Sequence, residues 1–245
     1  MEARTLVVGD IHGAYIALIQ ALERAKVSPE DHFIFLGDYV DGWSQSFEVV
    51  DFLLDFKKTH KCIFIKGNHD AWCEQWLANN IIQERWFNNG GEATIKSYSN
   101  IPSEKKTEHI NFFSTLVNYY TDDKKRLFIH AGFAHTKGPR FDRFDADSNW
   151  DKTLWETAVS MDKSIAYDSV FYPKRLKLFR EVFIGHTLTT DYGFTIPMQG
   201  TNVWNIDTGA GFKGKLTIMD AGTKEFWQSD FVAELYPNEK GRNGC

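Results

Sequence analysis

The sequence predicts an α/β protein, because short apolar runs alternate with segments of helical periodicity and a β-rich stretch closes the chain. Continuous apolar runs are typical of strands buried on both faces, and the helices between them indicate βαβ crossovers. Five runs end in a glycine turn that carries Asp, Asn or His, at the strand end where open α/β sheets bind ligands. The runs and their turns are Thr5–Val8 with Gly9-Asp10-Ile11-His12-Gly13, Phe33–Leu36 with Gly37-Asp38-Tyr39-Val40-Asp41-Gly42, Cys62–Ile65 with Gly67-Asn68-His69-Asp70, Leu127–Ile129 with His130-Ala131-Gly132, and Val182–Ile184 with Gly185-His186-Thr187.

Two amphipathic helices connect the first three runs. Ser44 or Ser46 can cap the second of them. Apolar residues at i, i+3, i+4 and i+7 mark their buried faces: Tyr15, Leu18, Ile19 and Leu22 in the first, and Val49, Phe52, Leu53 and Phe56 in the second.

The middle of the chain is less regular. Trp72 and Trp76 lie four residues apart, so we expect them to share a helix face and to pack in the core. The segment from Trp86 to Gly91 reads as a loop that could overhang a site, and residues 111–120 read as a helix. The polar stretch 135–151 is too long for a simple connector, which favours a functional or locally disordered loop.

The end of the chain is β-rich. Residues 203–206, a glycine turn at 209–214, and residues 216–219 and 226–227 predict a meander that forms part of a second sheet. We expect one domain over residues 1–236 and a polar, frayed tail over 237–245.

Composition narrows the class of protein. The 245 residues are 42% hydrophobic, which fits one globular domain. The net charge is −5 and Lys or Arg form no sustained run, so neither nucleic acid nor an anionic membrane is expected as the partner. Cys62, expected to be buried, Cys73 and Cys245 have no metal-ligand spacing. Without a signal peptide or a membrane-spanning run, we expect a cytoplasmic protein.

The strand-end turns carry oxygen and imidazole ligands but no thiolate. This set favours Mn, Fe, Zn or Ni over an all-oxygen calcium site. It exceeds what one tetrahedral metal needs, whereas two metals sharing a carboxylate would use all of it. Such a pair lowers the pKa of a bridging water and stabilises both oxygens of an in-line displacement, which indicates phosphoester hydrolysis. The candidate ligands are Asp10, His12, Asp38, Asn68, His130 and His186.

These five turns, in this order, resemble the signature of the PPP-type serine/threonine phosphatases, which belong to the calcineurin-like metallophosphoesterases. The segments Trp86–Gly91 and Asn205–Gly209 look like the bacterial and phage branch of that family. The resemblance implies a single-domain, four-layer α/β/β/α sandwich with two divalent metals, manganese first among them, at its edge.

The resemblance also implies roles for individual residues. Asp10, His12 and Asp38 would bind the first metal, and Asp38 would bridge to a second metal completed by Asn68, His130 and His186. His69 would be the general acid, oriented by Asp41, and Asn68 would also contact the substrate phosphate. Asp70 is expected to be structural and Asp207 to order the terminal turn. The other histidines are expected at the surface: His32, His60, His109 and His135.

One departure from the family pattern concerns the substrate phosphate. Where the family has Arg-Gly after the second aspartate, this chain has Gly42-Trp43, and residues 154–157 offer no second arginine. Arg140 and Arg143, on the loop after His130, are the candidates to replace it, with Arg143 favoured. The alternative is that both only pair with Asp142, Asp145 or Asp147.

The sequence therefore predicts a binuclear metal-dependent phosphomonoesterase that acts on a phosphorylated protein, through serine/threonine or tyrosine phosphate, or on a small phosphoester. Two rivals stay open. A dinucleoside polyphosphate hydrolase or a phosphodiesterase would use the same metal ligands, and a non-catalytic phosphate-binding module would keep the fold without turnover. The sequence does not indicate an oligomeric state.

Overall fold

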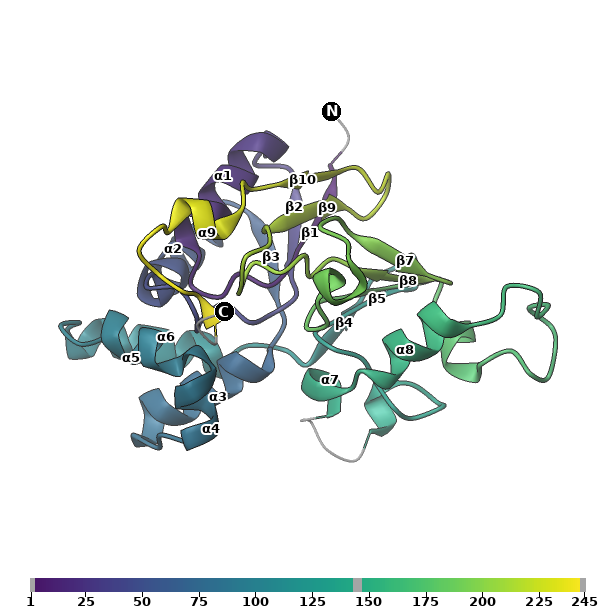
Figure 1. Ribbon diagram of the computed structural model, residues 1–245, viewed down its shortest axis with the longest axis horizontal. Helices are drawn as coiled ribbons and strands as arrows, with labels where there is room; N and C mark the ends of the chain where they lie inside the picture. The colour runs from purple at the N-terminus through teal and green to yellow at the C-terminus, as the bar shows by residue number, and fades with distance from the viewer. Residues whose placement is uncertain (1–2, 143–146, 243–245) are drawn as a thin grey trace.

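The computed structural model describes residues 3–142 and 147–242. Two five-stranded mixed sheets pack face to face, and helices cover their outer faces (Figure 1). The four-layer α/β/β/α sandwich is thereby confirmed. In the view of Figure 1, α1 and α2 lie to the left of the sheets and α8 lies to the right.

The first sheet has the strand order β10-β9-β1-β2-β3. Its parallel strands are β1 (Thr5–Val8), β2 (His32–Phe35) and β3 (Lys61–Phe64). The predicted crossover helices are present as α1 (Tyr15–Ala25) and α2 (Ser46–Phe56). The antiparallel strands β9 (Thr217–Asp220) and β10 (Phe226–Gln228) complete this sheet beside β1.

The second sheet has the strand order β4-β5-β6-β8-β7. Strands β5 (Arg126–Ile129), β6 (Glu181–Ile184) and β8 (Val203–Asn205) run parallel to one another. The edge strands β4 (Tyr119–Thr121) and β7 (Met198–Gly200) are antiparallel to their neighbours. Each of the five predicted runs is thus a parallel strand, three in the first sheet and two in the second.

The core explains why these strands are apolar on both faces. Leu6 and Val8 face the helix layer of the first sheet, whereas Val7 between them packs into the interface of the two sheets. Phe128 and Phe183 stack in that interface with ring centroids 5.0 Å apart. Because successive side chains of a strand alternate in direction, burial on both faces requires an uninterrupted apolar run.

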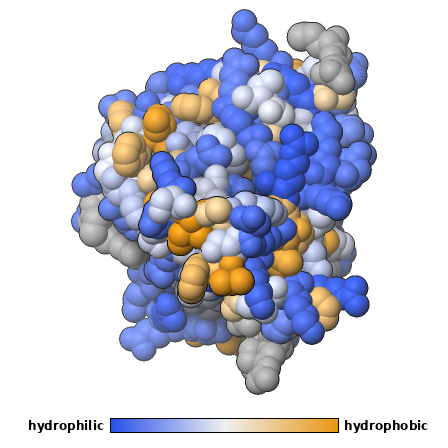
Figure 2. Space-filling view, turned by 90° about the vertical axis from the view of Figure 1, so that its right-hand side faces the viewer, coloured by the Kyte–Doolittle hydropathy of each residue, from blue (hydrophilic) through white to orange (hydrophobic). Residues whose placement is uncertain are grey.

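The remaining helices surround the carboxyl ends of the strands or cover the second sheet. A projecting loop, residues 161–173, follows α8 on the right of Figure 1. Figure 2 looks onto this side of the molecule and shows apolar side chains gathered near its middle; Val170 and Phe171 of the loop are 89% and 80% exposed. The helices are α3 (Asn68–Asn79), α4 (Glu84–Trp86), α5 (Glu92–Ser97), α6 (Ser103–Ser114), α7 (Asp147–Trp150), α8 (Thr153–Ser160) and α9 (Val232–Leu235).

The predicted terminal meander is wrong. Residues 203–205 do join the second sheet, but the chain then crosses over and β9 and β10 pair with the first sheet. The open edge of β1 offers unpaired backbone groups, and pairing with β9 satisfies them. No local pattern distinguishes this crossing from a hairpin.

Two predictions for the middle of the chain are also wrong. The segment Trp86–Gly91 is not an open loop over the site but a kinked connection between α4 and α5, with non-helical backbone at Asn89 and Gly90, and its Trp86 is fully buried. The helix predicted over 111–120 begins at Ser103 and ends at Ser114, and Tyr119–Thr121 forms β4.

Several side chains differ from expectation. Neither Ser44 nor Ser46 caps α2; Gln45 is the residue before the helix, and its side chain forms no capping hydrogen bond. The Ser46 hydroxyl bonds Asp41 and Thr94 instead, and the Ser44 hydroxyl bonds Glu239. Cys62 is only half-buried, since β3 is an edge strand. Among the residues expected at the surface, His109 is fully buried, where its Nδ1 pairs with the Tyr98 hydroxyl at 2.7 Å.

The segment after Pro237 is not frayed where the structure describes it, up to Arg242. Glu239 accepts hydrogen bonds from the backbone and hydroxyl of Ser44, and the Arg242 N–H donates to the Gly211 carbonyl at 2.8 Å. Across the described part of the chain, no helix combines the length and the apolar character that crossing a membrane requires.

Candidate metal centre

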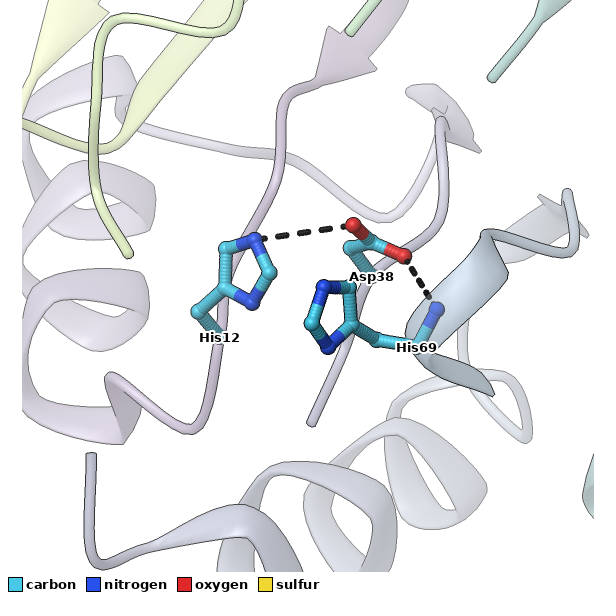
Figure 3. Close-up of side chains that lie close together, drawn as sticks. All are labelled: His12, Asp38 and His69. Carbon is cyan, nitrogen blue, oxygen red and sulfur yellow. Dashed lines mark hydrogen bonds and ion pairs between the residues drawn. The ribbon is translucent and has the colours of Figure 1, made fainter. Parts of the chain in front are cut away.

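The centre is built around the carboxylate of Asp38, which is 1% exposed. Its Oδ2 lies 3.5 Å from His12 Nε2, and its Oδ1 accepts the backbone N–H of His69 at 3.0 Å (Figure 3). The same Oδ2 lies 3.4 Å from His130 Nε2. Oδ2 is buried and has no hydrogen-bond partner among the described residues. A buried carboxylate oxygen between two imidazoles is costly unless a cation satisfies it.

Two backbone carbonyls orient these imidazoles. His12 Nδ1 donates to Val40 O at 3.1 Å, and His130 Nδ1 donates to Leu36 O at 2.8 Å. A proton held at Nδ1 leaves the Nε2 lone pair free, which is the arrangement seen in metal-binding histidines. Both Nε2 atoms are directed toward Asp38.

The other predicted ligands gather around the same carboxylate. Asp10 Oδ2 lies 3.9 Å from His12 Nε2, and its two oxygens accept the backbone N–H of His186 at 3.1 and 3.3 Å. Asn68 Oδ1 lies 3.1 Å from His130 Nε2. The Nε2 atom of His186 is buried without a partner in the described chain. All six predicted ligands therefore come together, four from the turns after β1, β2 and β3 of the first sheet and two from the turns after β5 and β6 of the second.

Two donor groups, each a set of side chains that could ligate a metal ion, share Asp38. His12, Asp38 and His69 form one, and Asp38, His130 and His186 form the other, each with its ligand atoms within 4.8 Å of one another. The two unpartnered atoms, Asp38 Oδ2 and His186 Nε2, are both potential ligands. The residues thus fit two divalent cations that share one carboxylate, and their imidazole and oxygen donors suit first-row transition metals.

The pKa shifts within the cluster also favour a bound cation. Burial and the charge of Asp207 raise the pKa of Asp10 well above its usual range. Although burial opposes it, the charge of Asp38 raises the pKa of His130 to about 10. Without a metal, the negative charge of Asp38 is therefore neutralised by a proton on His130. A bound divalent cation would neutralise that charge instead.

His69 and Asp41 form a buried pair beside this centre. His69 Nδ1 lies 2.6 Å from Asp41 Oδ2, which also accepts the Trp86 indole N–H at 2.7 Å, while Thr94 donates to Oδ1 at 2.6 Å. Burial raises the pKa of Asp41 to about 8 and lowers that of His69 to about 3. With Asp41 protonated and His69 neutral, as these shifts favour, the carboxyl proton lies between Asp41 and Nδ1, and the imidazole carries its own proton on Nε2.

Two glycines lie where the backbone approaches a ligand carboxylate too closely for any larger residue. A Cβ atom on Gly67 would overlap the Asp38 carboxylate, and one on Gly185 would overlap the carboxylate of Asp10. Four site residues also have positive φ values, a conformation that is strained for side chains other than glycine and concentrates at functional sites: His12, Asp38, Asp41 and His186.

Two buried aspartates support the turns. Asp70 accepts the backbone N–H groups of Gly67 and Asp38 at 2.8 Å and of Tyr39 at 2.9 Å, so it joins the second and third turns as expected. Asp207 accepts the Gly209 N–H at 3.0 Å and thereby orders the terminal turn, also as expected.

Of the two arginines predicted to bind phosphate, the structure describes only Arg140, and it does not enter the centre. Arg140 is exposed and its guanidinium packs over the ring of Phe141, and Arg143 lies outside the described residues. A different arginine is present instead: Arg242 Nη1 lies 3.3 Å from His12 Nε2. Nothing in the sequence singled it out, because it stands alone in a polar segment without a motif.

Sequence reasoning also missed an aromatic rim, formed by Trp72, Arg85 and Trp150. Trp72 meets the His69 ring edge-on at 5.2 Å, Trp150 meets His186 at 5.7 Å, and the two indoles contact each other at 5.1 Å. The Arg85 guanidinium lies 4.8 Å from the centre of the Trp150 ring. The rim joins α3 and α4 on one side of the centre to α7 on the other (Figure 1).

Comparison with known proteins agrees with this fold and site. Residues 3–190 match the family model of the calcineurin-like phosphoesterases, so the chain belongs to that family. Its ligand set and this membership make it a metal-dependent phosphoesterase, a hydrolase whose substrate carries a phosphoester.

Solved structures share the fold at low sequence identity. A proposed diadenosine tetraphosphatase is 17% identical with a TM-score of 0.61, and the match covers 92% of each chain. A protein serine/threonine phosphatase from Saccharomyces cerevisiae is 15% identical with a TM-score of 0.62, covering 100% of this chain and 84% of that one. A cold-active protein-tyrosine phosphatase from a Shewanella species is 12% identical with a TM-score of 0.56, covering 93% and 80%.

Proposed function

We propose that the protein is a binuclear phosphomonoesterase of the PPP type that dephosphorylates serine/threonine or tyrosine phosphate in proteins. The observation that carries this proposal is the carboxylate of Asp38, which belongs to both donor groups and has an unpartnered buried oxygen. A carboxylate shared between two groups of ligands can hold two ions close together, as two-metal phosphoesterase centres require.

The positions of the side chains support the ligand roles that the sequence implies. Asp10, His12 and Asp38 would hold one ion, and Asp38, Asn68, His130 and His186 would hold the other. When bound, the two ions would acidify water and neutralise charge on the phosphate. Asn68, whose amide lies at the edge of the second group, would also donate to a phosphate oxygen.

His69 is the general acid in this proposal. Its Nε2 proton is held in place because Nδ1 is bonded to Asp41, and its ring meets that of His12 edge-on at 5.0 Å. His69 also lies close enough to Asp38 to be a metal ligand. Its hydrogen bond to Asp41 instead favours the role of proton donor to the leaving oxygen.

The test is turnover by the metal-reconstituted protein. We expect hydrolysis of p-nitrophenyl phosphate that depends on added Mn²⁺ and stops with a chelator. Fe²⁺, Zn²⁺ and Ni²⁺, added in parallel, would show which metal supports the highest rate. Stoichiometric binding of two metals without turnover of any phosphoester would contradict the enzymatic proposal and favour a phosphate-binding module.

The aromatic rim favours a second candidate, a dinucleoside polyphosphate hydrolase or phosphodiesterase. Trp150 is 37% exposed and stands beside His186, so its ring could stack on a nucleobase, and Arg85 could contact a second phosphate. The same rim would also accept the ring of phosphotyrosine.

Product analysis separates these substrates. Serine, threonine and tyrosine phosphopeptides and diadenosine tetraphosphate should be compared at equal concentration with the Mn²⁺-loaded protein. If the rim binds an aromatic group, Trp150→Ala should lower kcat/KM for phosphotyrosine or the dinucleotide about 5- to 150-fold, the usual contribution of one stacking contact. Phosphoserine peptides serve as the control and should change little. An equal loss for all substrates would mean that Trp150 only supports His186.

A further inference from the structure

Arg242 brings a guanidinium into the metal centre from the end of the described chain. Its Nη1 lies 3.3 Å from His12 Nε2, and its guanidinium carbon lies 5.0 Å from the centre of the Phe212 ring. In sequence it is 230 residues away from His12. The segment that carries it is fixed on both sides of Gly241 by the bonds of Glu239 to Ser44 and of the Arg242 N–H to Gly211 O.

Glycines make room for its side chain. A Cβ on Gly42 would stand 3.0 Å from Arg242 Cγ, one on Gly90 would stand 3.2 Å from the same atom, and one on Gly211 would stand 3.1 Å from Cδ. Gly42 stands where the resemblance to the PPP-type phosphatases would imply an arginine. In this chain, the space beside Gly42 is therefore filled by an arginine stem that enters from another segment.

Arg242 forms no ion pair with the residues that the structure describes, although its charge acts at longer range on Asp41 and Asp207. Among the residues that the structure describes, no carboxylate oxygen lies within 4.0 Å of its guanidinium nitrogens. Its Nε is buried and, within the same residues, has no hydrogen-bond partner. A buried cationic donor without an anion is costly, and a bound anion would offset that cost.

His12 cannot be that partner when a metal is bound. Nδ1 of His12 donates to Val40 O, so the lone pair of Nε2 serves either Arg242 or a metal ion but not both. The guanidinium must leave Nε2 when an ion binds there, and its backbone bond to Gly211 keeps it near the centre. The oxygens of a phosphate held by the ions are then the acceptors within its reach.

We propose that Arg242 is the phosphate-binding arginine of this enzyme, supplied by the C-terminal segment in place of the residue missing at Gly42. This inference rests on the proposed function. It predicts that Arg242 binds the substrate phosphate directly through charge-assisted hydrogen bonds.

Three full-length variants test it: Arg242→Gln, Arg242→Lys and, as a matched control, Arg180→Gln. Arg180 is exposed and precedes β6, at the edge of the sheet away from the centre. Each protein is loaded with Mn²⁺; Mn²⁺ affinity is measured by electron paramagnetic resonance, inorganic phosphate affinity by calorimetry, and kcat/KM with p-nitrophenyl phosphate. Thermal unfolding of each variant verifies that it is folded.

We expect Arg242→Gln to weaken phosphate binding and to lower kcat/KM about 10- to 150-fold, the usual worth of a charged hydrogen bond. Arg242→Lys should lose less, because it keeps the charge but not the two-pronged geometry. Mn²⁺ affinity should stay equal or rise, and Arg180→Gln should match the wild type.

Two results would overturn the inference. If Arg242→Gln binds Mn²⁺ more tightly while phosphate affinity and kcat/KM change less than threefold, Arg242 only competes for the ligand atom of His12. If phosphate affinity falls equally in the Arg180 variant, the effect is general charge rather than contact. A wild-type protein that binds phosphate but turns over no ester would instead refute the proposed function, and the phosphate measurement would still decide the role of Arg242.

Discussion

The pairing of His69 with Asp41 allows a graded test of acid catalysis. Replacing His69 by Asn removes the Nε2 proton while leaving the six predicted ligands and the Asp38 backbone contacts in place. General acid catalysis contributes about 10²–10⁴ in rate, equivalent to about 2.7–5.5 kcal/mol in the barrier. We expect kcat for a phosphoserine peptide, whose alkoxide leaving group is strongly basic, to fall by that factor.

The expected loss depends on the leaving group. A nitrophenolate leaves without a proton, so His69→Asn should lower kcat for p-nitrophenyl phosphate much less than for phenyl phosphate or the peptide. Metal content, measured by elemental analysis of the dialysed protein, should stay at the wild-type level. A loss of the same size for all three substrates would refute the acid role and place His69 among the metal ligands.

The bonds around Asp41 predict the order of the weaker variants. Asp41 holds Nδ1 at 2.6 Å, and Trp86 holds Asp41 through its indole N–H at 2.7 Å. Asp41→Asn should therefore lose more activity than Trp86→Phe, and both should lose less than His69→Asn. Both variants should also lose more kcat for phenyl phosphate and the peptide than for p-nitrophenyl phosphate, since both act through the same His69 proton.

Two further predictions concern the metals and the stability of the fold. Asp38→Asn should abolish binding of both ions and nearly all turnover, because one neutral amide cannot serve two cations; full Mn²⁺ occupancy in metal analysis of that variant would contradict the binuclear centre. Asp31, whose buried carboxylate accepts Arg4 Nη2 at 2.6 Å, has a lowered pKa: burial alone would raise it, but the bonds from Arg4 and from the Ser28 N–H prevail. A depressed folded-state pKa stabilises the fold above about pH 4 and loses that effect as the pH falls through the folded-state value, so Asp31→Asn should cost about 1.5 kcal/mol at pH 7. Urea unfolding at pH 7 and pH 3 should show this difference shrinking at the lower pH, and a constant difference would exclude the linkage.

Much of the centre could be predicted from the sequence, for a local reason. Each turn carries its own ligand next to the glycine that lets the backbone approach, as Gly67 does for Asp38 and Gly185 for Asp10. Apolar runs then place these turns at strand ends. Packing of the parallel strands brings Asp10, Asp38 and His130 together without any long-range signal being needed in the sequence.

The parts that escaped prediction depend on contacts between distant segments. Trp86 reaches Asp41 across 45 residues, and its segment was misread because its Asn and Gly residues are typical of loops. Arg242 reaches the centre only because the chain folds back over Trp43, whose indole N–H donates to Ala210 O at 2.7 Å. The pairing of β9 with β1 likewise follows from an open sheet edge and not from the sequence of β9.

The division of the ligands between the two sheets has a consequence for assembly. Asp10, Asp38 and Asn68 follow strands of the first sheet, whereas His130 and His186 follow strands of the second. Neither half can form the second donor group alone, so capture of the second ion has to come after the halves have docked through Phe128, Phe183 and their neighbours. The ion of that second group would then link the two sheets at one edge of the sandwich, so that its loss weakens the packing of the halves before either sheet unfolds.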